Sequence, residues 1–419
     1  MTEEKCDFRG ARQKLQATDA AGMRAVSGVL YPVSATWRKQ VRVSYQSIVI
    51  GAGQAGLSAA YQLHRRGMVP GEDFLVLDAN EHPGGAWQHR WDTLTLGKAH
   101  RIHPLPDFPF ENQDPTRPAS EVVSGYYADF EAQHRLAVRR PAKVVAVSHD
   151  GTWFTVRLST GEELAARTLI NASGTWTNPF WPVYPGSRDF AGPQVHTNGF
   201  VAPEQFSGQR VLVVGGGASA TQFIVQLRAA GIDTLWSTRR APDWREVGHD
   251  PEWGVAVERE VNARTAAGLP PKSVVGTTGL ILTETMRAGI DSGALVSRGA
   301  ISALGAQSVR FADGTSEQID AILWATGFRH AHRHLRGLKL HTSAGGILVH
   351  NDSVSAAALP GMYFVGYGAS ASTVGATRAG RKAAVAAVRR LEELGVAVGS
   401  SGASLAAAEN RLPQMTTAR

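Results

Sequence analysis

Two glycine-rich loops constrain the fold of this chain more than any other feature. They read GAGQAG at residues 51–56 and GGGASA at 215–220. Each loop lies between a short apolar run that predicts a buried strand and a segment whose apolar spacing predicts a helix. The predicted strand, helix and second strand are 47–50, 55–66 and 74–77 around the first loop, and 210–214, 219–229 and 234–236 around the second. Each such unit predicts a Rossmann-like dinucleotide-binding domain, so the chain is predicted to contain two.

The first loop has the residue types that hold a dinucleotide. Gly51 permits a tight turn, Gly53 lets the backbone approach a pyrophosphate, and Gly56 lets the helix pack close to the strand. The N–H groups at the start of the helix attract the phosphates. Asp78 ends the next strand, where a carboxylate accepts hydrogen bonds from ribose hydroxyls. Together with Gln54, these residues form a candidate site for an adenosine without a 2′-phosphate, such as that of FAD.

The second loop differs from the first in the residues beyond its strand. Gly215, Gly217 and Ala220 occupy the three positions of the fingerprint. After the next strand there is no acid, and the chain reads Ser237-Thr238-Arg239-Arg240. A carboxylate would repel the 2′-phosphate of NADP, whereas hydroxyl and guanidinium groups bind it. This segment therefore predicts an NADPH site, with a solvated strand end as the alternative.

Charge and cysteine content exclude several classes of function. The formal charge is +7, but eight basic and only four acidic residues lie in the first 44 positions, so no basic stripe marks the folded part and nucleic acid is not a predicted partner. The single cysteine, Cys6, excludes a C-x-x-C dithiol. The apolar runs are interrupted by glycine and polar residues, so no membrane span is predicted. Because the first 44 residues lack a secretory apolar region, we expect a cytoplasmic location.

Strands resume after the second unit, which indicates that the second domain is inserted into the first. The expected α/β organisation is a disordered leader at 1–44, a discontinuous FAD-binding domain at 45–185 and 320–395, an NADPH-binding domain at 186–319 with a helical cap at 241–290, and a flexible tail at 396–419. A targeting role is the alternative for the leader. The cap region is expected to be either a substrate lid or a dimer surface, so a homodimer is one of two alternatives.

Several motifs, in this order along the chain, resemble those of class B flavin-dependent monooxygenases. This group includes flavin-containing, indole-pyruvate and Baeyer–Villiger monooxygenases. Besides the two loops, the motifs are Gly84-Gly85-Ala86-Trp87, Ala172-Ser173-Gly174, the F-x-G-x-x-x-H-x-x-x-F signature from Phe190 to Phe200, Ala325-Thr326-Gly327 and Phe364-Val365-Gly366. The resemblance covers about residues 45–395 and is to bacterial members in particular. Phe200 stands where Baeyer–Villiger enzymes usually have tryptophan, which favours heteroatom or indole-pyruvate-type oxidation.

The resemblance implies a flavin-dependent oxidoreductase with FAD and NADPH as cofactors and O2 as co-substrate. Hydride passes from NADPH to the flavin, O2 then gives a C4a-(hydro)peroxyflavin, and one oxygen atom enters a small organic substrate at nitrogen, sulfur or a carbonyl carbon. Gly85, Trp87 and Gly366 are expected beside the flavin, and the last predicted helix, 377–394, is expected to direct its positive end at it. Two alternatives stay open: an NADPH oxidase or reductase that passes electrons to O2 or a partner, and a non-enzymatic dinucleotide-binding sensor.

The resemblance also identifies weaker catalytic candidates. Flavin-containing monooxygenases often have an asparagine beside the flavin where this chain has Gly97, so the role passes to water, to Lys98 or to His100, or the oxygen adduct is short-lived. His196, in the 190–200 signature, is either a hinge residue at the domain linker or a structural histidine. His100 and His103 have no evident third ligand, so no metal site is predicted.

Overall fold

The computed structural model describes residues 23–26, 29–32, 43–99, 102–111, 113–246, 251–271 and 279–398. The chain divides into two compact units, Met1–Arg42 and Val43–Arg419. In the first unit, β1 (Met23–Val26) and β2 (Val29–Pro32) pair as an antiparallel hairpin. The last two residues of the predicted leader, Val43 and Ser44, begin a strand of the second unit. The other residues of that leader, and the predicted tail from residue 399 onward, lie outside the described residues.

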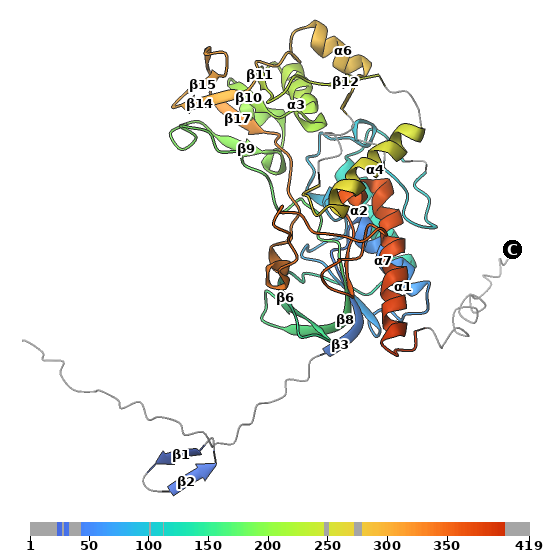
Figure 1. Cartoon of the computed structure of the whole chain (residues 1–419). Coiled ribbons are helices and arrows are strands. Elements are labelled where there is room, and N and C mark those ends of the chain that lie inside the picture. Colours follow the sequence, from blue (N-terminus) through green and yellow to red (C-terminus); the bar gives the residue numbers. More distant parts are fainter. Residues whose placement is uncertain are drawn as a thin grey trace, which may run out of the picture. The chain divides into compact units, whose positions relative to one another are not determined.

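The larger sheet of the second unit has seven strands (Figure 1). Its order is β5-β4-β3-β8-β7-β6, with β18 paired to β8. The strands are β3 (Val43–Ile50), β4 (Phe74–Leu77), β5 (Val138–Arg139), β6 (Val144–His149), β7 (Phe154–Leu158), β8 (Glu163–Asn171) and β18 (Met362–Phe364). The central strand β3 is parallel to β4 and β8. Because β18 joins this sheet from far along the chain, the sheet is built from two separate parts of the sequence, as the predicted insertion requires.

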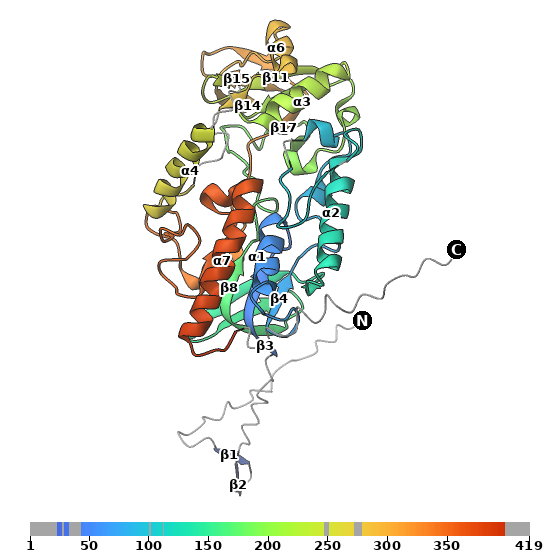
Figure 2. The ribbon, with the colours of Figure 1, turned by 90° about the vertical axis from the view of Figure 1, so that its right-hand side faces the viewer.

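Three helices pack on one face of this sheet. They are α1 (Gln54–His64), α2 (Ala119–Gln133) and α7 (Thr373–Glu393), whose apolar side chains share one core with β3 and β4. The other face is covered by the short helix η5 (Arg333–Leu338) and the chain that follows it. Figures 1 and 2 show α1 and α7 side by side. Gly380 permits this closeness, because a Cβ there would lie only 2.8 Å from the Ala59 backbone nitrogen.

The second sheet has four parallel strands in the order β11-β10-β17-β9. They are β9 (Gln194–His196), β10 (Arg210–Val214), β11 (Asp233–Ser237) and β17 (Ala321–Trp324). Helix α3 (Ala218–Ala229) packs on one face. An antiparallel sheet of β14 (Ile301–Gly305), β15 (Ser308–Phe311) and β16 (Ser316–Gln318) contributes to the core on the other. Each glycine loop thus joins a parallel strand of its own sheet to the helix that packs on that sheet.

Strand β17 lies in the second sheet, where Ala321 pairs with Val211 of β10. The expected domain boundary at residue 320 instead assigns this strand to the first domain. All four β17 residues are buried, a pattern that suits an interior parallel strand of either sheet, so burial alone does not assign β17 to one of them. The predicted cap region holds α4 (Pro251–Ala266), most of α6 (Glu284–Asp291) and the short paired strands β12 (Trp244–Arg245) and β13 (Leu280–Ile281).

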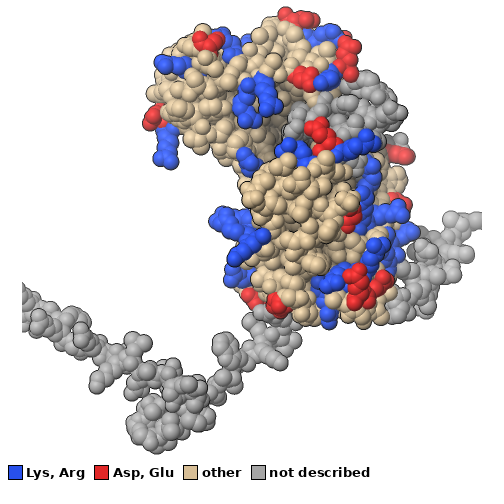
Figure 3. Space-filling view, viewed as in Figure 1, with Lys and Arg blue, Asp and Glu red and all other residues tan. Residues whose placement is uncertain are grey.

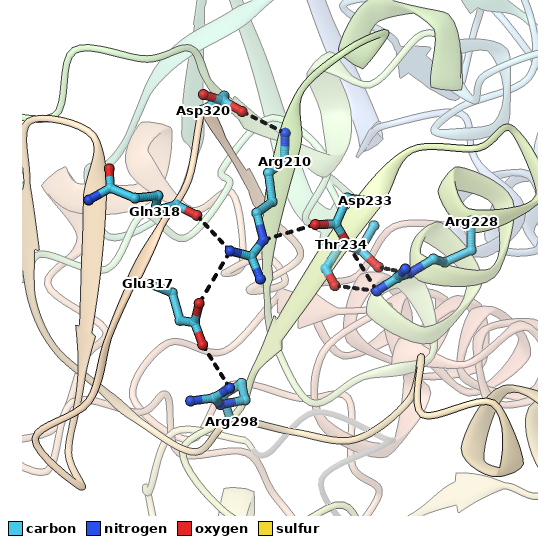
Figure 4. A network of polar contacts seen from close by, with 8 residues as sticks. All are labelled: Arg210, Arg228, Asp233, Thr234, Arg298, Glu317, Gln318 and Asp320. Atoms are coloured by element: carbon cyan, nitrogen blue, oxygen red, sulfur yellow. Dashed lines mark hydrogen bonds and ion pairs between the residues drawn. The ribbon is translucent and has the colours of Figure 1, made fainter.

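A charged network closes the amino end of the second sheet (Figure 4). Arg210, the first residue of β10, pairs with Asp233 at 2.9 Å and with Glu317 at 3.2 Å. Arg228 pairs with Asp233 at 3.2 Å, and Arg298 pairs with Glu317 at 2.9 Å. These side chains are paired with one another at the amino end of the sheet, opposite the second glycine loop, which follows the carboxyl end of β10.

Two surface properties bear on partners. No helix among the described residues combines the length and the apolar character needed to cross a membrane. On the face shown in Figure 3, basic and acidic side chains are scattered over a mainly uncharged surface.

Candidate functional site

The first glycine loop turns directly from β3 into α1. Gly51 has a φ of 103°, and a Cβ there would overlap the Ala172 carbonyl oxygen. A Cβ on Gly56 would overlap the Gly51 carbonyl oxygen. The helix begins after Gly53 with no side-chain cap, so the backbone N–H groups of its first turn have no side-chain acceptor from the capping position. The turn and the close helix–strand packing therefore both require glycine.

The predicted flavin-side residues lie against this loop. A Cβ on Gly85 would lie 2.8 Å from Gly53 Cα, and a Cβ on Gly366 would lie 4.0 Å from Ala55 Cβ. Trp87 begins the short helix η1 (Trp87–His89) directly after the Gly84-Gly85-Ala86 segment. Residues from three distant parts of the sequence thus gather around the N-terminus of α1.

Asp78 stands at the end of β4 and is 3% exposed. Its Oδ2 accepts the Ala52 amide at 2.7 Å, and its Oδ1 accepts the Asn80 amide at 2.8 Å. These bonds fix the carboxylate beside the glycine loop. Each carboxylate oxygen has a second lone pair, which leaves acceptor capacity for a hydroxyl group.

Gln54 connects the loop to three other elements. Its Nε2 donates to the His103 carbonyl oxygen at 3.0 Å and to Thr377 Oγ1 of α7 at 3.0 Å. Its Oε1 accepts the Tyr127 hydroxyl of α2 at 2.8 Å, and Trp87 in turn donates a side-chain hydrogen bond to Tyr127. The side chain of Gln54 is therefore occupied within the protein, and it holds the N-terminal turns of α1 and α7 together.

The second glycine loop repeats the design of the first. Gly215 has a φ of 143°, and a Cβ there would overlap the Ala325 carbonyl oxygen. Gly217 is the N-cap of α3 and provides no side-chain cap, and Ala220 is fully buried in the helix. Helices α6 and α7 are capped by Thr283 and Ser372, whereas α2, after Pro118, has no side-chain cap. In α1 and α3 the uncapped end follows a glycine loop, an arrangement that leaves the first backbone N–H groups open to an anion.

The polar segment after β11 divides into two parts. The Ser237 hydroxyl donates to the Gly299 carbonyl oxygen at 2.8 Å. The Thr238 hydroxyl, only 5% exposed, donates to the Arg240 carbonyl oxygen at 2.6 Å. Arg239 and Arg240 are exposed and form no ion pair with a described residue. The guanidinium groups are therefore available to an anion, whereas Thr238 instead fixes the backbone of Arg240.

Known proteins are similar to this chain in sequence and in fold. A family model described as pyridine nucleotide-disulphide oxidoreductase matches residues 48–266. The chain is 32% identical over 321 residues to the indole-3-pyruvate monooxygenase YUCCA1 of Oryza sativa subsp. japonica, across 68% of this chain and 76% of that protein. It is 32% identical to the flavin-containing monooxygenase structure from Stenotrophomonas maltophilia, with a TM-score of 0.67 over 83% of this chain and 99% of the other. A bacillithiol disulfide reductase, Bdr (YpdA), from Staphylococcus aureus shares the fold at 16% identity and a TM-score of 0.59.

The chain belongs to the pyridine nucleotide-disulphide oxidoreductase family. Within this family it is a member of the flavin-dependent monooxygenase group, as its motifs predicted. It is an enzyme with two Rossmann-like domains that uses FAD and a nicotinamide dinucleotide. Unlike the members whose activity gives the family its name, it has one cysteine in its sequence and no dithiol pair.

In this family member, the 190–200 signature anchors the connections between the two sheets. His196, 2% exposed, contacts the Gly327 carbonyl oxygen through Nε2 at 3.1 Å and Asn198 through Nδ1 at 3.2 Å. Burial lowers the pKa of His196, so the ring is neutral at physiological pH. The ring centroids of Phe200 and Trp91 lie 5.5 Å apart. The contacts with Gly327 and Trp91 join segments that are far apart in the sequence, whereas the Asn198 contact is local.

The oxygen-side candidates lie in the short helix η2 (Leu96–Lys98). A Cβ on Gly97 would lie 3.2 Å from Pro115, so a side chain at this position would start against that proline. Lys98 is exposed, and its carbonyl oxygen accepts Gln222 Nε2 of α3 at 3.3 Å. His100 lies outside the described residues.

A row of histidines, of which His332 and His334 are buried and His330 is half-buried, was not among the predicted site residues. Burial lowers the pKa of His330 and His334 to about 4 and that of His332 well below its ordinary value. His334 contacts Asn171 Oδ1 at 2.8 Å, at the end of β8. The alternating H-A-H-R-H sequence beside the Ala325-Thr326-Gly327 motif is the signal that marks this row. No group of three or more His, Cys, Asp or Glu side chains in the described part of the chain is placed to hold a metal.

Proposed function

We propose that this chain is an NADPH-dependent FAD monooxygenase that inserts one atom of O2 into a small organic substrate, at nitrogen, sulfur or a carbonyl carbon. One observation carries the proposal: the chain has two uncapped helices after glycine loops, with opposite charges beside them. An acid, Asp78, stands beside the first, and two free guanidinium groups, Arg239 and Arg240, stand beside the second. This difference supports a flavin nucleotide at the first site and a 2′-phosphorylated nucleotide at the second.

At the first site, Gly51, Gly53 and Gly56 would let the pyrophosphate approach the N-terminus of α1, and Asp78 would accept the ribose hydroxyls. Gly85, Trp87 and Gly366 would border the ring system. The Gln54–Thr377 bond supports a role for α7, because it places that helix's first turns beside α1. The positive end of α7 would then favour the negative charge of a reduced flavin.

At the second site, Gly215, Gly217 and Ala220 would form the phosphate turn, and Arg239 and Arg240 would hold the 2′-phosphate. When bound, the flavin supplies the oxygen chemistry, through the C4a-(hydro)peroxide that the family resemblance implies. The protein would then have to orient both nucleotides and exclude water. Trp91 supports a role of the protein in orienting the two nucleotides. Its ring centroid lies 4.9 Å from that of Phe223 in α3, so it links the 91–98 loop to the second domain.

The sheet pairing supports a domain assignment close to the predicted one. The FAD-binding domain would take residues 43–185 and the chain after β17, and the NADPH-binding domain would take the chain between them, β17 included. The Oryza relative is named for indole-3-pyruvate, and an organic acid of that kind falls within the proposed substrate class.

The proposal is tested on the purified flavin-loaded protein by anaerobic reduction with NADPH, followed by rapid mixing with oxygenated buffer. We expect fast reduction, then an intermediate flavin spectrum that lasts longer when NADP⁺ is present. Replacement of both Arg239 and Arg240 by alanine should raise the KM for NADPH by at least about tenfold and leave the KM for NADH nearly unchanged.

The alternative function is an NADPH oxidase or reductase. Gly97, at the position where flavin-containing monooxygenases often have an asparagine, favours this alternative because it has no side chain that could hold an oxygen adduct. It would appear in the same experiment as direct return to oxidised flavin with release of peroxide. A protein that NADPH does not reduce at all would contradict both functions and leave a dinucleotide-binding sensor.

A further inference from the structure

Arg90 lies just beyond the flavin-side motif and is held by aromatic rings. Its amide donates to the Trp87 carbonyl oxygen at 2.9 Å, which closes the η1 turn. Its guanidinium carbon lies 4.4 Å from the centroid of Trp176 and 5.6 Å from that of Trp87. The two indoles therefore fix the position of the cation.

The surroundings of Arg90 place it where three segments meet. Trp87 belongs to the motif that lies against the first glycine loop. Trp176 follows the Ala172-Ser173-Gly174 strand end, and its ring stacks on Phe328 at 5.0 Å, just after the Ala325-Thr326-Gly327 strand end. Arg90 thus lies beside the predicted flavin site, at the connections between the two sheets.

The charge of Arg90 has no counterion among the described residues. No carboxylate pairs with it there, its Nε is buried without a hydrogen-bond partner, and burial alone lowers its pKa to about 10. The group therefore remains charged at neutral pH. Arg90 is half-buried, and Nε is its buried atom without a hydrogen-bond partner. Arg140 differs from it because its two terminal nitrogens are bound by both oxygens of Glu131 at 2.7 Å. The guanidinium of Arg90 is therefore a partly accessible cation that has no carboxylate of its own.

We propose that Arg90, held in position by Trp87 and Trp176, binds the carboxylate of the organic substrate. The proposal rests on the proposed function and narrows its substrate class to small organic acids. A guanidinium binds a carboxylate through two parallel hydrogen bonds. Arg90 would then be a specificity-determining residue that positions the substrate beside the flavin.

Binding of an acid and its neutral amide to the full, flavin-loaded protein tests this role without turnover. The probes are indole-3-acetate with indole-3-acetamide, and phenylacetate with phenylacetamide, measured by isothermal titration calorimetry. We expect the wild type to prefer at least one acid over its amide by about 10- to 100-fold. Arg90→Met should remove the preference, and Arg90→Lys should retain part of it because it keeps the charge but not the two-pronged geometry.

Arg167→Met is the matched control. Arg167 lies 4.4 Å over Trp153 and also has a buried Nε without a partner, but it belongs to the interior of β8. This variant should keep the preference for the acid. Circular dichroism and flavin content should show that all three variants are folded and loaded.

Three results would overturn the proposal. In the first, the wild type binds no acid more tightly than its amide. In the second, the preference survives in Arg90→Met. In the third, Arg90→Met weakens binding of FAD or NADPH, measured by the same titration, and leaves the acid preference intact, which would assign Arg90 to a cofactor phosphate. Failure of the proposed function is separate, because it would appear in the reaction with O2 while the acid preference and its loss in Arg90→Met persist.

Discussion

The row of histidines makes the folded state sensitive to acid. Burial lowers the pKa of His330 and His334 to about 4, whereas an unfolded histidine titrates near 6.5. Below about pH 6.5 the unfolded chain therefore binds protons that the folded chain does not. Above about pH 6.5 these two histidines do not reduce the free energy of unfolding. As the pH falls from there toward 4, the free energy of unfolding decreases.

The size of the effect can be worked out from the two pKa values. Each histidine should lower the free energy of unfolding by about 2 kcal/mol between pH 7 and pH 5, and by about 3 kcal/mol when the titration is complete. For a folded unit of this length, about 2 kcal/mol corresponds to a shift of roughly 3 °C in the unfolding midpoint. The two histidines together should thus lower the midpoint by about 6 °C over these two pH units.

Thermal unfolding followed by circular dichroism at pH 7 and pH 5, with saturating FAD, measures this shift. His334→Gln keeps an amide N–H that can donate to Asn171 Oδ1, and it removes the titrating group. His330→Gln removes the other one. Between pH 7 and pH 5, the free energy of unfolding of each variant should fall by about 2 kcal/mol less than that of the wild type. The exposed His350→Gln should behave as the wild type does. Equal acid sensitivity in all four proteins would refute the reasoning.

Two further substitutions test the glycine loop and its support. Gly56→Ala, which places a Cβ on the Gly51 carbonyl oxygen, should yield protein with almost no bound flavin by absorbance, whereas Gly125→Ala, at an open position of α2, should retain flavin and raise stability by about 0.5–1 kcal/mol. Tyr127→Phe leaves the buried Gln54 Oε1 without its donor, so urea unfolding should show a loss of about 1–3 kcal/mol, and an unchanged midpoint would contradict the role of that bond.

Local signals explain which parts of the fold could be predicted. The glycine loops carry their own context, because strand, turn and helix succeed one another within a few residues, and the strands and helices around both loops are found where the sequence placed them. Strand β17 was harder to assign. Its residues are buried on both faces, and only hydrogen-bond pairing with β10 shows which sheet contains it.

Side-chain partners of the site could not be read from spacing. The sequence places Gln54 in the loop, but its bonds reach His103, Tyr127 and Thr377, which no local pattern connects to it. Thr238 shows the reverse case, because its hydroxyl fits a phosphate by type and yet donates to a carbonyl oxygen two residues away. Residue type predicted the chemistry of these positions, whereas the direction of each side chain depended on tertiary contacts.

The two connections between the sheets are tied to each other. Phe180 on the first connection donates its amide to the Gly327 carbonyl oxygen on the second at 3.0 Å, and His196, at the end of β9, contacts the same oxygen. Both connections are therefore fixed at one point to the second sheet. The 91–98 loop adds a separate link to that domain, because Trp91 packs on Phe223 of α3 and the Lys98 carbonyl oxygen accepts Gln222 Nε2.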